Sequence, residues 1–126
     1  MSLDVTSTLD ITTALATGAQ VVGTVASFDQ VNNIGRGVIL AINVTNINGG
    51  TYTVTVQGKD PVSGGYYTLL VSAALAANAL TTLTVYPGVT AAANVAASAP
   101  LPRIWRVSVT VAAATVTATI GATLID

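Results

Sequence analysis

The side chains that could carry chemistry are few in this chain of 126 residues. The sequence holds five Asp, no Glu, one Lys, three Arg, no His and no Cys. Zinc, haem, iron–sulfur, cysteine-protease and Ser-His-Asp sites all need histidine or cysteine, so this chain alone cannot assemble any of them. Because there is no cysteine, there is no disulfide framework, and the sequence indicates no redox compartment.

Two aspartates, Asp29 and Asp60, lie inside the chain beyond its N-terminal segment. A pair of carboxylates can act as general acid and base, as in glycosidases, but nothing in the sequence fixes their separation. Asp60 precedes Pro61, which is typical of turn initiation. A calcium site at Asp60 would need the alternating acidic ligands that this Gly-rich loop lacks. We therefore predict no catalytic residue, no metal site and no cofactor.

The three arginines are candidate contacts for a partner. Arg103 and Arg106 are three residues apart, so in a strand their side chains point to opposite faces. Together they could anchor an acidic patch on a partner, or they could serve solubility and form a local ion pair with Asp60. Arg36 lies between two glycines, which give the backbone freedom to reach a partner, but it could equally be a solvated residue at a strand start.

Four aromatic residues, Tyr66, Tyr67, Tyr86 and Trp105, could form a platform that stacks on sugars. Tyr66 and Tyr67 are adjacent, so a strand can present only one of them on a given side. The others lie among alternating apolar residues, which is typical of a core or its rim. The glycine pairs at residues 49–50 and 64–65 lack the lysine of a phosphate-binding loop and indicate turns.

The composition is apolar and poor in charge. Hydrophobic residues make up 52% of the chain and charged residues 7%, against roughly 25% charged residues in an average globular domain. A net charge of −1 gives no electrostatic footprint for nucleic acid. The longest aliphatic run, residues 38–42, is far below the ~20 residues that span a bilayer. We therefore expect a homo-oligomer with neither nucleic acid nor membrane as a partner.

Strand patterns recur along the chain with turn residues between them. In residues 51–59, Tyr52, Val54 and Val56 alternate with threonines, which is the period of a half-buried strand. The predicted strands are residues 19–26, 35–47, 51–59, 66–72, 80–86, 103–111 and 115–125. About seven to eight strands without a convincing helix predict an all-β, single-domain antiparallel β-sandwich, either jelly-roll or Ig-like.

Two segments flank or interrupt this pattern without a clear period. Residues 1–18 are rich in Thr, Asp and Leu, and we interpret them as an N-terminal arm or an added edge strand before a sandwich domain at residues 19–126. Residues 73–78 could form one helical turn between strands.

Residues 89–102 form a long Ala-rich connection. A loop of this length in a compact domain is usually functional or disordered. The segment could pack on its own sandwich, or it could pack on a neighbouring subunit through residues such as Val89, Ala92 and Val95.

An ordered series of segments also gives a resemblance. They are GRGV at residues 35–38, VQGKDPVSGGYYTLL at residues 56–70, VYPG at residues 85–88 and LPRIWRV at residues 101–107. The series resembles a group of small all-β proteins of tailed bacteriophages, found among virion structural proteins, and it covers roughly residues 27–125. The resemblance implies a capsid-associated role, above all that of a decoration, or cement, protein.

We therefore expect a non-enzymatic phage structural protein on the outer capsid surface of the virion, made in the host cytoplasm. It would form a homo-oligomer, with a trimer as the favoured state, and it would bind the major capsid protein through many weak contacts. Its N-terminal arm and residues 89–102 are the expected attachment segments. The candidate contacts are Arg36, Arg103, Arg106, Val89, Ala92 and Val95. The alternatives are a head–tail or tail-associated virion component, and a carbohydrate-binding or host-adhesion module that uses the tyrosines.

Overall fold

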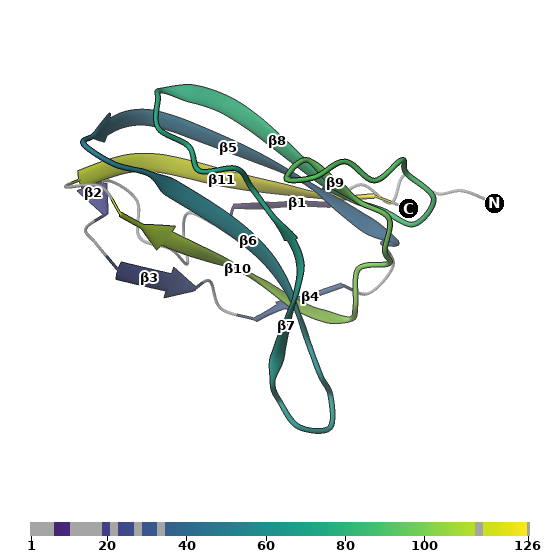
Figure 1. Cartoon of the computed structure of the whole chain (residues 1–126). Helices are drawn as coiled ribbons and strands as arrows, with labels where there is room; N and C mark the ends of the chain where they lie inside the picture. The colour runs from purple at the N-terminus through teal and green to yellow at the C-terminus, as the bar shows by residue number, and fades with distance from the viewer. Residues whose placement is uncertain are drawn as a thin grey trace.

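The computed structural model describes residues 7–10, 19–20, 23–26, 29–32, 35–112 and 115–125 (Figure 1). Every regular element in these residues is a β-strand. The strands are β1 (Ser7–Asp10), β2 (Ala19–Gln20), β3 (Gly23–Ala26), β4 (Gln30–Val31), β5 (Gly37–Asn48), β6 (Tyr52–Lys59), β7 (Tyr66–Val71), β8 (Ala79–Val85), β9 (Ala96–Ala97), β10 (Ile104–Val111) and β11 (Thr115–Ile125). Within the described ranges, no helix could cross a membrane.

The strands form where β-branched residues occupy successive positions, so that their side chains point alternately to the inner and the outer face of a sheet. In β6, the inward positions are buried and each outward position is half-buried. Valine and threonine lose little side-chain freedom in an extended chain, and they pack well on a pleated surface. The same sequence pattern therefore supplies both the apolar inner faces and the threonine-rich outer faces.

The strands build two sheets. Sheet A has the order β1–β11–β5–β8–β9, with β2 also paired to β11, and sheet B has the order β3–β10–β6–β7, with β4 also paired to β10. The short strands β1 and β2 pair with different stretches of β11, so they share one edge position. Likewise, β3 and β4 share one position beside β10. Each sheet therefore has four main strand positions, and the two-residue β9 extends sheet A.

The order of pairing along the chain is nested. Counted as eight positions, the first pairs with the last (β1 and β2 with β11), the second with the seventh (β3 and β4 with β10), the third with the sixth (β5 with β8) and the fourth with the fifth (β6 with β7). All of these pairs are antiparallel. Nested pairing of this kind is the connectivity of a jelly roll and differs from that of an Ig domain. The predicted antiparallel β-sandwich of about eight strands is confirmed.

The inner faces of the two sheets form one apolar core. Its largest fully buried side chains are Trp105 on β10 and Tyr52 on β6. Around them lie aliphatic side chains of both sheets, such as Leu40 and Ile42 on β5 and Leu83 on β8. Because the core is almost wholly aliphatic, the fold draws little on the few charged residues for its stability.

Two sequence predictions of local structure are wrong. In place of one strand over residues 19–26, residues 19–20 and 23–26 are separate strands in different sheets, since β2 pairs with β11 and β3 pairs with β10. Residues 73–78 contain no helical turn, because Leu75 pairs with Tyr52 through two backbone hydrogen bonds of 2.9 Å. That pairing requires an extended backbone at Leu75.

The connection at residues 89–102 packs on its own sandwich. It contains β9, which pairs in parallel with the end of β8. Asn94, at a φ of 64°, donates a side-chain hydrogen bond of 3.1 Å to the carbonyl of Val71 on the edge of β7. Leu101, near the end of the connection, is buried in the core. Val89 is half-buried, whereas Ala92 and Val95 are exposed.

The N-terminal segment contributes to the sandwich. Residues 7–10 form β1, which pairs along β11 as an edge of sheet A. This placement corresponds to the added edge strand of the two interpretations. The remainder of residues 1–18 lies outside the described residues.

Candidate functional site

All four basic residues of the sequence lie at one end of the sandwich. This end is where β5 and β10 begin and where β6 and β11 end, as the pairing of Gly37 with Ile125 and of Gly58 with Trp105 shows. We call it the charged end, and the charged residues that the structure describes there are Asp29, Arg36, Lys59, Asp60, Arg103 and Arg106. The sequence spreads these residues over almost eighty positions, and the nested strand pairing brings them together.

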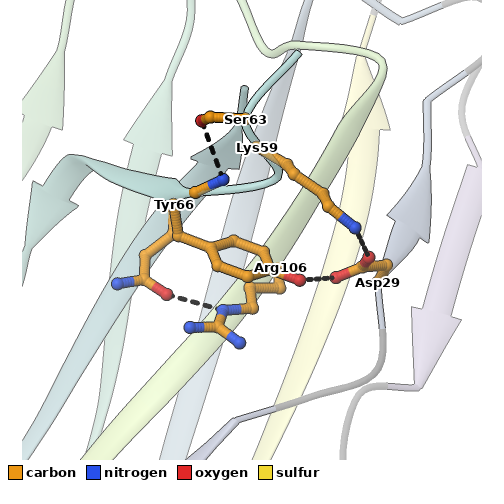
Figure 2. Close-up of polar contacts among 7 residues, drawn as sticks. Asp29, Lys59, Ser63, Tyr66 and Arg106 are labelled. Carbon is orange, nitrogen blue, oxygen red and sulfur yellow. Dashed lines mark hydrogen bonds and ion pairs between the residues drawn. The ribbon is translucent and has the colours of Figure 1, made fainter. Parts of the chain in front are cut away.

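A group of side chains braces the base of the β6–β7 hairpin (Figure 2). The Lys59 ammonium lies 3.0 Å from one carboxylate oxygen of Asp29, and the Tyr66 hydroxyl donates a hydrogen bond of 2.6 Å to the other. The Arg106 guanidinium lies 3.4 Å from the centroid of the Tyr66 ring, and its Nε donates a hydrogen bond of 2.7 Å to Gln57. We call these five residues the brace.

The register of sheet B places the brace on its outer face. Lys59 is directly opposite Tyr66, and Gln57 is directly opposite Arg106. Directly opposite residues share a face and lie within contact distance of each other. Asp29 reaches the same face from the residue before β4, so three segments of the chain meet there.

Hydrogen bonds and nearby charge extend the ionised range of two acids of this end, Asp29 and Asp60, to lower pH. The hydrogen bonds from Tyr66 and then Lys59 hold the pKa of the Asp29 carboxyl below its usual 3.8. Asp29 in turn raises the pKa of the Lys59 ammonium above its usual value. The backbone amide of Val62 and the hydroxyl of Ser63 lower the pKa of the Asp60 carboxyl.

The tip of the β6–β7 hairpin is closed by its own side chains. Asp60 accepts hydrogen bonds from the Val62 amide at 2.9 Å and from the Ser63 hydroxyl at 2.7 Å. Gly64, at a φ of 78°, allows the tight return of the chain. The hairpin extends beyond the body of the sandwich (Figure 1), and Val62 at its tip is 93% exposed. Asp60 therefore has the turn-initiating role that the sequence predicted.

A buried asparagine, Asn32, joins the segment before β5, which carries Arg36, to the segment before β10, which carries Arg103. Asn32 donates side-chain hydrogen bonds of 2.7 Å to the Gly35 carbonyl and 3.1 Å to the Leu101 carbonyl, and it accepts one of 2.8 Å from the Gly35 amide. Its own amide donates to the Arg103 carbonyl at 2.7 Å, and the Leu101 amide donates to the Arg36 carbonyl at 2.8 Å. The backbones that carry Arg36 and Arg103 are thus held together.

The sequence analysis did not identify Asn32. Its side chain bonds across a sequence separation of 69 residues to Leu101. A single Asn gives no such signal, because asparagine before a glycine-rich segment is common in any turn.

The two arginines that the sequence paired are separated by the structure. Arg106 belongs to the brace, whereas Arg103 precedes β10 and lies beside the segment of Arg36. Asp60 is engaged with its own loop, and in the described part of the chain the ion pair at this end joins Lys59 to Asp29. The suggested ion pair of an arginine with Asp60 is not formed.

The aromatic residues do not meet on one surface. Tyr66 is on the outer face of sheet B, where Arg106 covers its ring. Tyr67 is on the inner side, where it lies over Gly58; a Cβ on Gly58 would be 2.6 Å from its ring. Trp105 is fully buried, and its indole N–H has no partner among the described residues. Tyr66, Tyr67 and Trp105 therefore do not share one stacking surface.

The outer face of sheet A has a contrasting surface. The register gives three rows across β11, β5 and β8: Thr123, Ile39 and Thr84; Gly121, Ala41 and Thr82; Thr119, Asn43 and Leu80. None of these nine residues is charged. Leu80 is 68% exposed and Ile39 is 36% exposed, so the face is partly apolar.

The described residues enclose no detected pocket and bring together no group of three residues that could hold a metal ion. Compared with known proteins, the chain matches no protein family, no curated protein and no solved structure.

Proposed function

We propose that this protein is a non-enzymatic structural component of a tailed-bacteriophage virion, a decoration protein that binds the outer surface of the capsid. The observation that carries the proposal is the separation of surface chemistry on one rigid jelly roll. The four basic residues are gathered at one end, and the three rows across β11, β5 and β8 on the outer face of sheet A are uncharged and rich in threonine. A subunit of a particle needs such distinct surfaces to contact its own copies and the shell.

Two further arguments support the proposal. Jelly rolls recur among viral capsid and lectin domains, so the fold is compatible with the proposed role. The sequence series at residues 35–38, 56–70, 85–88 and 101–107 also resembles small all-β virion proteins. The structure uses these segments as the start of β5, the β6–β7 hairpin, the turn after β8 and the entry to β10.

In this proposal the outer face of sheet A joins copies of the chain into a homo-oligomer. Burying the nine residues of the three rows on β11, β5 and β8 desolvates no charged group, because all nine are neutral; Asp10 on β1 lies opposite Gly121 at the edge of the sheet. Threonine also has few rotamers to lose on association. The charged end is then left to contact the major capsid protein.

Quantitative mass spectrometry of purified virions tests the proposal. Virions of the encoding phage are digested, and copies of this chain are counted against the major capsid protein. A ratio near parity, or a simple lattice fraction of it, supports decoration of the shell. A handful of copies assigns the protein to the head–tail connector or the tail. Absence from the particle overturns the proposal and makes a glycan-binding adhesion module the next hypothesis.

The N-terminal attachment hypothesis needs a test adapted to β1. Deleting residues 1–17 removes β1 and uncovers the edge of β11, so loss of capsid binding would have two causes. Deleting residues 1–6 leaves β1 in place. If the arm attaches the protein, the shorter deletion lowers capsid binding while the circular dichroism spectrum stays unchanged. Unchanged binding contradicts attachment through residues 1–6.

A further inference from the structure

We propose that Arg36 and Arg103 form a preorganised cationic pair that docks on an acidic protein surface, and that this surface belongs to the capsid shell. This inference rests on the proposed function and adds which end of the molecule faces the shell. The sequence suggested Arg103 with Arg106; the structure assigns Arg36 as its companion.

Arg36 and Arg103 are the two charged residues left without a charged or aromatic partner when the other described charges of this end are assigned. Lys59 and Asp29 form an ion pair, and Asp60 is bound within its own turn. Arg106 stacks on Tyr66 and is hydrogen-bonded to Gln57. Arg36 and Arg103 are both exposed, and neither forms an ion pair with a carboxylate of the described residues.

The backbone segments that carry the two arginines are also held in position. Asn32 is 7% exposed and links the segment before β5 to the segment before β10 through its hydrogen bonds to Gly35, Leu101 and Arg103. Two exposed arginines on fixed backbones lose less freedom on binding than two on mobile loops, and this preorganisation favours affinity. The guanidinium fork also matches a carboxylate with two parallel hydrogen bonds.

The chemistry of the surroundings favours an acidic protein over a nucleic acid. A nucleic-acid site needs several phosphate contacts, and this chain has four basic residues in all, two of them engaged in the brace. Stacking of bases needs an open aromatic face, whereas Arg106 covers the ring of Tyr66. Two guanidinium groups are enough for a patch of two or three carboxylates.

The test compares capsid binding by variants of equal net charge. Capsids are purified from a phage lacking this chain, and cosedimentation is measured at low and high salt. The variant carries Arg36→Gln with Arg103→Gln. The control carries Ala74→Glu with Ala77→Glu, two exposed positions at the opposite end of the sandwich, which lowers the net charge by the same amount. Arg36→Lys with Arg103→Lys keeps the charge and removes the guanidinium fork.

We expect the Gln variant to lose about tenfold or more in affinity at low salt, which corresponds to about 1.4 kcal/mol. The control should bind as the wild type does, and the affinity of the Lys variant should be intermediate. Raising the salt concentration should weaken capsid binding by the wild type but should leave that of the Gln variant unchanged. The thermal unfolding midpoints of all variants should agree, because the substituted residues are exposed.

The outcomes separate this inference from the proposed function. If the wild type binds capsids and the Gln variant binds equally well, the inference is wrong and the decoration role stands. If the wild type does not bind capsids, both are wrong. Binding of double-stranded DNA at physiological salt that depends on Arg36 and Arg103 would overturn the inference in favour of a nucleic-acid partner.

Discussion

The two ends of the sandwich are built by different means. At the charged end, side chains bond to backbone and to each other: Asn32 joins two entry segments, and the brace holds a projecting hairpin. The opposite end, which we call the far end, contains the turns at residues 48–51 and 72–78, and these turns have no charged residue. There, the Tyr52 hydroxyl is buried with no partner among the described residues.

The difference shows how a chain with so few charges uses them. The aliphatic core supplies the stability of both ends, so charge is not needed to hold the sheets together. The charged side chains instead hold the surface of the charged end, including the β6–β7 hairpin, in one conformation. The far end tolerates an unpaired hydroxyl because the burial of the Tyr52 ring outweighs it. We therefore expect substitution of Gly37 or Asn32 at the charged end to destabilise the fold, and removal of the Tyr52 hydroxyl at the far end to stabilise it.

The largest effect is expected at a glycine of the charged end. A Cβ on Gly37 would be 2.1 Å from the Val85 carbonyl oxygen and 3.0 Å from the Tyr86 Cα. Because these are backbone atoms, Gly37→Ala must push β5 and β8 apart, at a cost of about 3 kcal/mol of unfolding free energy. Urea denaturation measures this loss.

Gly121→Ala is the matched control on the outer face of sheet A. A Cβ there meets nothing within 4 Å, so the substitution should be neutral or stabilise by about 0.5 kcal/mol. Equal losses for the two variants would show that the backbones at the charged end are not closely packed.

The next largest effect is expected at Asn32. Asn32→Ala leaves the Gly35 amide and the Gly35 and Leu101 carbonyls without their side-chain partner, which should cost about 2 kcal/mol. Asn43→Ala, on the exposed outer face of sheet A, should change the unfolding free energy by less than about 0.5 kcal/mol. If thermal denaturation shows that Asn32→Ala destabilises the protein no more than Asn43→Ala does, the hydrogen bonds of Asn32 do not hold the charged end together.

At the far end, a substitution should stabilise. Tyr52→Phe removes the buried hydroxyl that lacks a partner and keeps the ring, so the unfolding free energy should rise by about 1 kcal/mol at neutral pH. Destabilisation would reveal a hydrogen-bond partner of this hydroxyl. Calorimetry at neutral pH measures the change.

The same variant predicts a dependence on alkaline pH. Burial raises the pKa of Tyr52 from 10.0 to about 12. The unfolded chain therefore releases this proton at lower pH than the folded protein does, and the wild type loses stability as the pH rises from 10 to 12. The advantage of Tyr52→Phe should widen over this range by up to about 2–3 kcal/mol. Stability curves that stay parallel would contradict the buried, protonated hydroxyl.

The sequence predicted the fold better than the site, for a physical reason. Strands such as β6 and β11 declare themselves through alternation of neighbouring residues, which is local information. Contacts between Asp29 and Tyr66, or between Asn32 and Leu101, depend on which strands pair, and nested pairing brings together residues that are distant in sequence. The choice of jelly roll over Ig-like sandwich depends on the same long-range pairing. The change of sheet between β2 and β3 was missed because residues 19–26 form one short run, and its local pattern does not indicate which strand each part pairs with.

The smallest effect is expected at the brace, and it should be local. Asp29→Asn removes the ion pair with Lys59 and the charged acceptor of the Tyr66 hydroxyl. The Lys59 and Asp29 side chains are 32% and 34% exposed, so water screens their ion pair and the global unfolding midpoint should stay nearly unchanged. The amides of Asp60 and Gly64, which bond within the hairpin, should instead exchange with deuterium several-fold faster, because the hairpin opens locally.

A pH titration of the wild type sharpens this last expectation. The pKa of Asp29 is held below 3.8 in the folded protein, so its contribution is present above 3.8 and is lost as the pH falls through the lower folded value. Tyr66→Phe, which keeps the ring under Arg106 but removes the hydroxyl, should raise the onset of this loss toward higher pH. If the hairpin amides of the wild type and of Asp29→Asn exchange at the same rate at neutral pH, the charges do not hold the hairpin. The hydrogen bonds of Asn32 are then the feature that distinguishes the charged end from the far end.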